Sequence, residues 1–193
     1  MQSKQDMQLF VVNLLKEKLS PFYYYHNHAH TLFVLASAIE IGLSEGCTKE
    51  ELDLLTAAAL WHDTGYINTY THHEEASCLL ARQYLPDYGY TATAIDRVCG
   101  MIMATKLPQS PKNKLEAIIA DADLAYLGTG SAAAQAGNLF KELLHRHPRL
   151  TPAKWDKTQV TFLKMHHYFT HYCKEVKEPA KQQYLWQLQQ DCL

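Results

Sequence analysis

The stretch Ala57-Ala58-Ala59-Leu60-Trp61-His62-Asp63-Thr64-Gly65-Tyr66 (residues 57–66) places two metal-ligand side chains at the end of an apolar helix. Its small residues let the helix approach a neighbour closely, and Gly65 predicts a C-terminal break. Neighbouring residues on a helix point about 100° apart. His62 and Asp63 can therefore flank one ion from two sides and supply a nitrogen and an oxygen ligand.

The helix that carries this pair has a clear start. Thr48 followed by Glu51 is the pattern of a capping box, in which each side chain bonds to the other residue's backbone N–H. Leu52, Leu55, Ala59 and His62 then lie along one helix face. The spacing predicts a helix whose last turn presents His62 and Asp63.

A second cluster of candidate ligands lies upstream, in Tyr25-His26-Asn27-His28-Ala29-His30. His26 and His30 are four residues apart and would share one face if this turn is helical. One of them could then bind an ion and the other a substrate. The alternative is that these histidines cap a helix and lie in solvent.

A third apolar stretch, residues 115–127, contains Asp121 and Asp123. A carboxylate in such a stretch is costly to bury without a cation or hydrogen-bond donors, unless it lies at a helix end. Taken in order, His30, His62, Asp63 and Asp123 have the residue types and separations of one metal site built from three helices.

The apolar spacing is helical almost throughout, so we predict an all-α, single-domain helical bundle over residues 1–193. The metal-site core spans about 25–127. The C-terminal helices within 131–191 either complete the core or form a dimer seam. Ser110-Pro111 and Thr151-Pro152 are expected helix starts. In the second helix Leu32, Leu35, Ala36 and Ile39 are expected to face inward. Helices are expected at about 4–19, 27–44, 48–63, 72–85, 89–104, 112–126, 131–147, 152–172 and 179–191.

The composition narrows the class of protein. With 47% apolar residues, 20% charged residues and a formal net charge of -2, the chain is typical of globular proteins and has no basic surface for nucleic acid. Five scattered cysteines predict reduced thiols rather than disulfides. The polar start and the lack of a long apolar run predict neither a signal peptide nor a membrane span, hence a cytoplasmic protein.

On these residues the chain resembles the HD superfamily of metal-dependent phosphohydrolases, whose signature is a histidine, a histidine-aspartate pair and a distant aspartate on a helical bundle. The resemblance runs from about Tyr25 to Leu127. It implies that His30, His62, Asp63 and Asp123 are the metal ligands. Asp123 is preferred over Asp121 because Leu124 follows it, as in the family pattern, and Asp121 would then lie behind the ligands.

Further roles follow from the same resemblance. Tyr25-His26-Asn27 is similar to a motif of cyclic-nucleotide phosphodiesterases, which makes His26 a candidate general acid. Asp63 or Asp123 could orient the attacking water. His73 is a candidate ligand for a second ion, the alternative being an exposed helix start. Independently of the resemblance, Lys106 is a candidate phosphate contact just beyond the Ala104-Thr105 turn, the alternative being a solvated lysine. The tandem histidines of dinuclear members are absent between Arg97 and Lys114, so one tightly held ion is expected and a second would bind weakly.

The ligand set accepts manganese, iron, cobalt, nickel, zinc or magnesium, and the sequence does not choose among these divalent ions. The predicted function is hydrolysis of a phosphomonoester or phosphodiester, of a nucleotide-like small molecule, by a metal-activated water. A cyclic nucleotide is one option. The expected partners are this small-molecule phosphoester and a second copy of the chain in a homodimer, with no nucleic-acid polymer and no membrane. The alternative is a non-catalytic regulatory protein that binds a metal or a nucleotide.

Overall fold

A computed structural model describes residues 3–191 of the chain, and every regular element within that range is helical. The all-α prediction is confirmed. The α-helices are α1 Lys4–Lys18, α2 His28–Ser44, α3 Lys49–Trp61, α4 His73–Tyr84, α5 Ala92–Ala104, α6 Lys114–Asp123, α7 Ala132–Arg146, α8 Pro152–Met165 and α9 Glu178–Asp191. Short 3₁₀ helices lie at Thr64–Ile67, Leu85–Tyr88 and Ala125–Gly128, and a π-helical turn at Cys173–Lys177 leads into α9.

Side-chain caps set most of the helix starts. Thr48 and Glu51 form the predicted capping box of α3, and the Thr151 hydroxyl caps α8 with Pro152 in the first turn. Asn27 caps α2 by accepting from the amides of Ala29 and His30. This cap fixes the start of α2, and His30 lies in the first turn after it.

Two predicted helix boundaries are wrong. Ser110-Pro111 does not start α6, because Asn113 caps that helix by accepting from the Glu116 amide. The helix expected over 152–172 ends at Met165, and residues 166–169 are not helical. The second error has a physical reason: the Asp121 carboxylate accepts hydrogen bonds from the backbone amides of Phe169 and Thr170, at 2.8–3.1 Å. A tertiary partner thus binds amides that a continuous helix would use internally.

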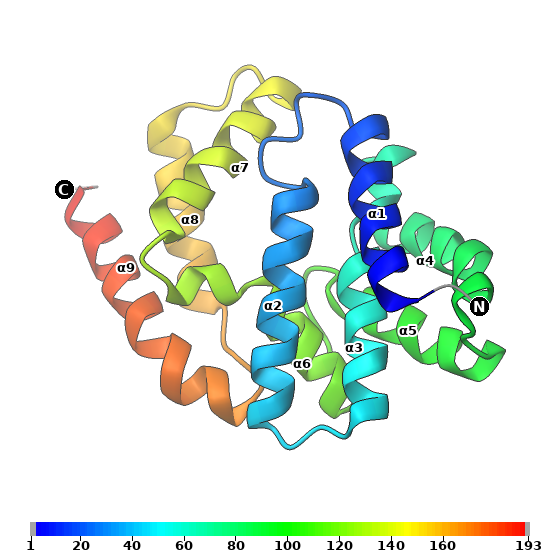
Figure 1. Cartoon of the computed structure of the whole chain (residues 1–193). Helices are drawn as coiled ribbons and strands as arrows, with labels where there is room; N and C mark the ends of the chain where they lie inside the picture. The colour runs from blue at the N-terminus through cyan, green and yellow to red at the C-terminus, as the bar shows by residue number, and fades with distance from the viewer. Residues whose placement is uncertain (1–2, 192–193) are drawn as a thin grey trace.

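The core forms where α2 and α3 pack together and α6 packs across both, with α5 behind α3 (Figure 1). The buried residues of α2 are His30, Thr31, Val34, Ser37, Ala38, Ile41 and Gly42, and of these His30 faces the site. The predicted inward face of α2 is only partly right, since Leu35 is half-buried and packs against the core, Leu32 and Ile39 are half-buried, and Ala36 is exposed. The buried face of α2 begins with a polar residue, His30, which points to the metal site. The positions of the apolar residues alone therefore do not identify this face.

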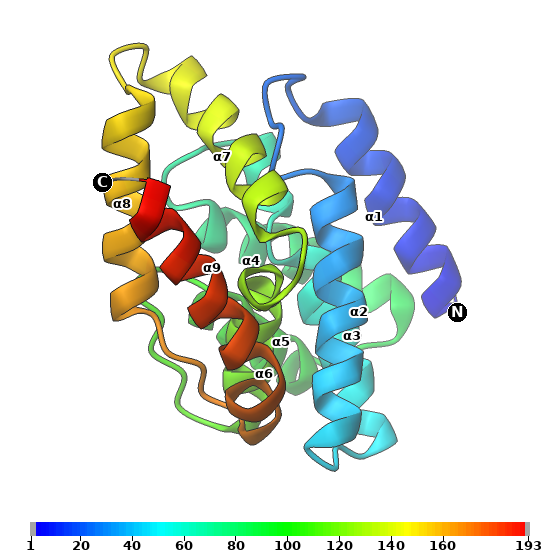
Figure 2. The same ribbon diagram turned by 90° about the vertical axis from the view of Figure 1, so that its left-hand side faces the viewer.

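A second apolar cluster lies on the other side of α2 and α6, among α7, α8 and α9 (Figure 2). Leu124 and Leu127, just after α6, pack there with Leu163 of α8 and Leu185 of α9. α9 also packs against the 3₁₀ helix that follows α6. The two sides of the molecule therefore meet at the C-terminal end of α6, next to Asp123. Among the described residues, no helix is long and apolar enough to cross a membrane.

Candidate metal centre

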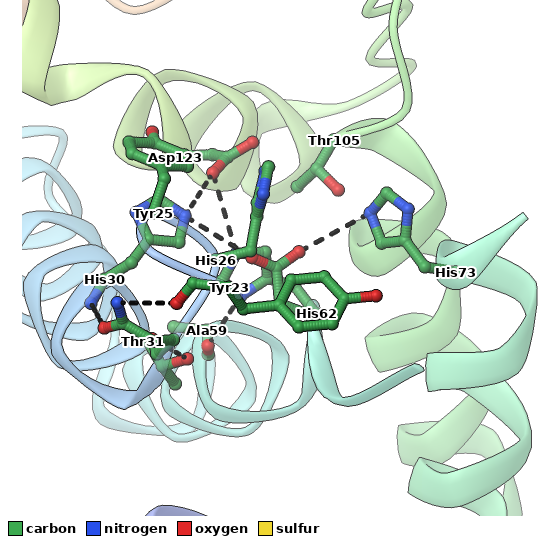
Figure 3. Close-up of polar contacts among 12 residues, drawn as sticks. Tyr23, Tyr25, His26, His30, Thr31, Ala59, His62, His73, Thr105 and Asp123 are labelled. Carbon is green, nitrogen blue, oxygen red and sulfur yellow. Dashed lines mark hydrogen bonds and ion pairs between the residues drawn. The ribbon is translucent and has the colours of Figure 1, made fainter. Parts of the chain in front are cut away.

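Four side chains from three helices converge at one point (Figure 3). His30 comes from the first turn of α2, and Asp123 is the last residue of α6. His62 caps the C-terminal end of α3, and Asp63 follows it at the start of a 3₁₀ turn. The structure thus brings together all four residues that the sequence singled out, each at a helix end.

The ligand-type atoms lie at the spacing that one ion requires. His30 Nε2 lies 3.0 Å from Asp123 Oδ1 and 3.5 Å from Asp63 Oδ2. His62 Nε2 lies 3.2 Å from Asp63 Oδ2 and 3.6 Å from Asp123 Oδ1. Bonds of about 2.0–2.2 Å from imidazole nitrogen and carboxylate oxygen to a metal place neighbouring ligand atoms about 3 to 3.5 Å apart. Within the described part of the chain, His30, His62 and Asp123 form the one group of three or more ligand residues close enough to hold an ion.

The orientation of His62 favours metal binding over a hydrogen-bonded core histidine. Its Nδ1 lies 2.8 Å from the Ala59 carbonyl oxygen and donates to it, so in the neutral ring Nε2 has the lone pair and faces the site. His62 Nε2 and Asp63 Oδ2 are both fully buried and have no hydrogen-bond partner among the described residues. Unpartnered buried polar atoms are costly, and a shared cation would satisfy both. The residues present therefore fit a divalent ion.

The charges at the site also favour a bound cation. Burial disfavours the imidazolium of His62, but the Asp63 and Asp123 carboxylates outweigh it and raise the pKa of His62 well above its usual value. Burial also disfavours the Asp63 carboxylate, yet the neighbouring His62 holds the pKa of Asp63 well below its usual value. Two buried carboxylates with two imidazoles create a negative site that attracts a proton or a cation.

His26 reaches the site by a different route from the one predicted. It precedes the Asn27 cap and so does not share a helix face with His30, which corrects that expectation. Instead, Glu142 of α7 accepts from the backbone amides of Tyr25 and His26, and its Oε1 lies 2.6 Å from His26 Nδ1. The rings of His26 and His30 lie 5.9 Å apart, which places His26 beside the ligands rather than among them.

Glu142 is a site residue that the sequence analysis missed. Burial disfavours its charge, but the hydrogen bond with His26 lowers the pKa of Glu142 below its usual value. Burial likewise disfavours the His26 imidazolium, and the hydrogen bond to Glu142 outweighs it, so the pKa of His26 is raised. A signal was available: Glu142 is three residues from Leu139, on the inner stripe of α7, where a carboxylate needs a partner.

His73 and Lys106 lie at the outer edge of the site. His73 Nε2 is 3.5 Å from Asp63 Oδ1, the oxygen that does not face His30 and His62, and its ring stacks on Tyr66 at 3.9 Å between centroids. The Lys106 ammonium forms a short ion pair with Glu75. Thr105, buried just before Lys106, lies between Asp123 and His73 in Figure 3.

Asp121 does not join the ligands. Its carboxylate accepts from the amides of Phe169 and Thr170 and from the Thr170 hydroxyl, which lies 2.7 Å from Oδ2. Burial raises the pKa of Asp121 despite these bonds. The structure therefore places Asp123 in the ligand group and gives Asp121 a different task, which is to hold the segment between α8 and α9 against α6.

A cavity of about 560 Å³ opens from the ligands. Asp63, Asp123 and His26 line it at one part of its wall, and Thr105 and Lys106 line the neighbouring part. Among the four candidate ligands Asp123 has the most exposed side chain, at 18%, so solvent reaches the site next to Asp123. This volume is within the range of small-molecule sites.

Residues 27–125 match the family model of the HD domain. The chain belongs to the HD-domain family. The matched range covers slightly more than half of the 193 residues and contains His30, His62, Asp63 and Asp123. His26 and Glu142, which form the hydrogen-bonded pair beside the ligands, both lie outside it.

Two solved structures share the fold. The crystal structure of a predicted HD superfamily hydrolase from an uncultured Thermotogales bacterium is 19% identical, with a TM-score of 0.66, over 95% of this chain and 90% of that one. The crystal structure of a Listeria innocua protein is 16% identical, with a TM-score of 0.63, over 98% of this chain and 97% of that one. No curated protein sequence matches the chain. The family and the ligand group together support a metal-dependent hydrolase.

Proposed function

We propose that this HD-domain protein is a metal-dependent phosphohydrolase that cleaves a phosphomonoester or phosphodiester with water. The observation that carries the proposal is the group of four candidate ligands, in which the buried atoms His62 Nε2 and Asp63 Oδ2 lie 3.2 Å apart and neither makes a hydrogen bond. His30, His62, Asp63 and Asp123 would hold one divalent ion. A divalent ion in such a set lowers the pKa of a coordinated water and polarises a phosphoryl oxygen.

The protein's own residues have separate tasks in this proposal. Oδ2 of Asp63 faces the two histidines, whereas Oδ1 faces His73 and the cavity. Asp63 can therefore bind the ion through one oxygen and orient the attacking water through the other. Ala59 holds the His62 ring in the tautomer whose Nε2 is a ligand.

His26 is the proposed general acid. Its ring lines the cavity beside the ligands, and its Nδ1–H donates to Glu142. When the ring is protonated, Nε2–H is free to donate a proton to the leaving oxygen. Since Glu142 raises the pKa of His26, the imidazolium persists to higher pH than that of an ordinary histidine.

A weaker second ion is proposed at His73, next to Asp63 Oδ1. Asp63 would then bridge two ions through its two oxygens. Lys106 remains a proposed phosphate contact. To bind a phosphate, its ammonium must first leave the ion pair with Glu75, which is half-exposed. A nucleotide-like substrate and a homodimer are part of the same proposal, and Tyr70, half-buried in the cavity wall, is compatible with stacking on a base.

The test is turnover of a phosphoester panel by protein loaded with each divalent ion in turn. The panel contains nucleoside monophosphates, cyclic nucleotides and aryl phosphates. His62→Ala should abolish metal-dependent turnover while the helical circular-dichroism spectrum is kept. His147→Ala, at an exposed histidine at the end of α7, is the matched control and should retain turnover. Full activity in His62→Ala would overturn the proposal. Tight metal or nucleotide binding without turnover of any panel member would support the non-catalytic regulator instead.

A further inference from the structure

The cavity at the metal centre extends well beyond the space that a phosphoryl group needs. From Asp123 it continues between α7, α8 and α9, where Leu139 and Leu143 of α7 face Trp155 and Phe162 of α8. We call this part of the cavity the apolar limb. It is lined by one stripe of α7, at positions 136, 139 and 143, and one stripe of α8, at positions 155, 159 and 162. Inner stripes of this kind normally close on each other as core, yet here they bound open space.

The polar side chains of the apolar limb are already paired. The Tyr184 hydroxyl donates to Gln159 Oε1 at 2.8 Å, and Gln159 Nε2 donates to Asp156 at 3.3 Å. The Thr158 hydroxyl donates to the backbone of its own helix, at the Lys154 carbonyl oxygen. The amide of Gln159 therefore has a partner on both of its ends, and the limb offers little to a ligand's polar groups.

The unpartnered buried polar atoms of the described residues lie elsewhere. They belong to Trp61, His62, Asp63, Glu75 and His166. Of these only Asp63 lines the cavity, and it does so at the metal centre. The cavity thus combines one polar part, at the ligands and at Lys106, with one part that is apolar and saturated in hydrogen bonds.

We propose that the substrate is a phosphomonoester of a bulky apolar alcohol, with its phosphoryl group at the metal centre and its alkyl or ring system in the apolar limb. This inference rests on the proposed hydrolysis of a phosphoester, and it replaces the nucleotide-like substrate with an apolar one. A nucleobase in this limb would lose its hydrogen bonds to water and meet side chains that already have partners. An apolar group has no hydrogen bonds to lose on entering the limb, and its transfer out of water is favourable.

The chemistry is the hydrolysis already proposed. The water oxygen forms a bond to phosphorus, and the bond between phosphorus and the alcohol oxygen breaks. The His26 imidazolium gives its proton to the released alcohol oxygen, and the proton that the attacking water loses then restores the imidazolium. The products are the alcohol and inorganic phosphate. No oxidant or co-reactant is needed. The apolar limb lies on the leaving-alcohol side of this reaction.

Binding and turnover should both be measured, so that this inference and the hydrolase proposal can fail separately. Calorimetry with n-alkylphosphonates from ethyl to octyl, whose carbon–phosphorus bond resists hydrolysis, should show Kd falling roughly three- to four-fold per methylene. The heat capacity change should become more negative along the series. The matching alkyl phosphates should show kcat/KM rising by the same factor, and the kcat/KM of octyl phosphate should exceed those of adenosine and guanosine monophosphates.

Two variants test whether the alkyl chain of the ligand lies in the apolar limb. Ala136→Leu puts a larger side chain into the limb from α7 and should lower the octyl-to-ethyl preference roughly ten-fold or more. Ala134→Leu makes the same change on the exposed side of α7 and should leave the preference unaltered. If circular dichroism shows Ala136→Leu to be unfolded, Leu139→Asn replaces it, because its amide meets no free partner in the limb.

Each combination of results has one meaning. Chain-length dependence in binding with no turnover supports the apolar limb and overturns the hydrolase proposal. Turnover without chain-length dependence, or with nucleoside monophosphates preferred over octyl phosphate, overturns the apolar substrate and leaves the hydrolase proposal standing. A dependence on alkyl-chain length that survives Ala136→Leu also overturns the inference, since the alkyl chain would then lie outside the apolar limb. The absence of both binding and turnover rejects both.

Discussion

Glu142 Oε1 lies 2.6 Å from Nδ1 of His26, although the two residues are 116 positions apart in the sequence. Glu142 also accepts from the backbone amides of Tyr25 and His26, so one carboxylate of α7 fixes both the ring and the backbone of the segment before α2. The C-terminal helices are therefore part of the candidate active site, and they position a residue that the matched HD-domain range does not include.

Glu142→Gln should shift the pH profile of turnover. Glu142 raises the pKa of His26, and the protonated ring is the proposed acid, so activity is present below that pKa and is lost as pH rises through it. Glutamine can still accept from the two amides but removes the negative charge, so the pKa of His26 falls. The basic limb of the kcat/KM profile should move to lower pH.

Glu50→Gln, an exposed acid in the first turn of α3, is the control and should leave the profile in place. His26→Ala should lower kcat by about 10²-fold or more and remove this limb. A Glu142→Gln profile that coincides with the wild type would show that Glu142 only holds the backbone and that His26 is not the acid.

His73→Ala should separate the two proposed ions. Of the two Asp63 oxygens, His73 lies next to Oδ1, whereas Oδ2 faces His30 and His62. The variant should keep the tight ion and lose the weaker one in a manganese titration followed by calorimetry. His72→Ala is a neighbouring control, since the His72 side chain is 75% exposed. Loss of the tight ion in His73→Ala would place His73 in the primary ligand set.

Asp121→Ala should destabilise the protein without removing the metal. The change leaves the amides of Phe169 and Thr170 without their acceptor, which costs about 2–4 kcal/mol in the free energy of unfolding. Part of the cost is offset because burial disfavours the charged carboxylate. Urea unfolding followed by circular dichroism measures the loss. A single cooperative transition would also support the predicted single domain, whereas two separate transitions would contradict it.

The sequence predicted the four converging side chains because each carries its own local signal. The capping box predicts the start of α3, the closely spaced histidines mark the start of α2, and the carboxylates of α6 interrupt an apolar stretch. What it did not predict depends on contacts between distant segments. The end of α8 at Met165 follows from Asp121, and the position of His26 follows from Glu142. Neither partner is near its target in the sequence, so local propensity gave the wrong answer for residues 166–169 and for the turn at His26.

The apolar limb illustrates the same point. The stripes of α7 and α8 are periodic in the sequence and predict buried faces. Whether two buried faces meet or leave a cavity depends on the angle between the helices and on the size of residues such as Ala136. The sequence left the C-terminal helices open between core and dimer seam. In the structure they pack on the region after α6 and surround the cavity.

The most direct measurement is the metal content of Asp123→Ala and Asp121→Ala, purified side by side with the wild type and reconstituted with the same divalent ion. The two aspartates are two residues apart on α6, but only Asp123 faces His30 and His62. Elemental analysis should give about one ion per chain for the wild type and for Asp121→Ala, and close to none for Asp123→Ala. Retention of the ion in Asp123→Ala, or its selective loss in Asp121→Ala, would contradict the metal centre described above.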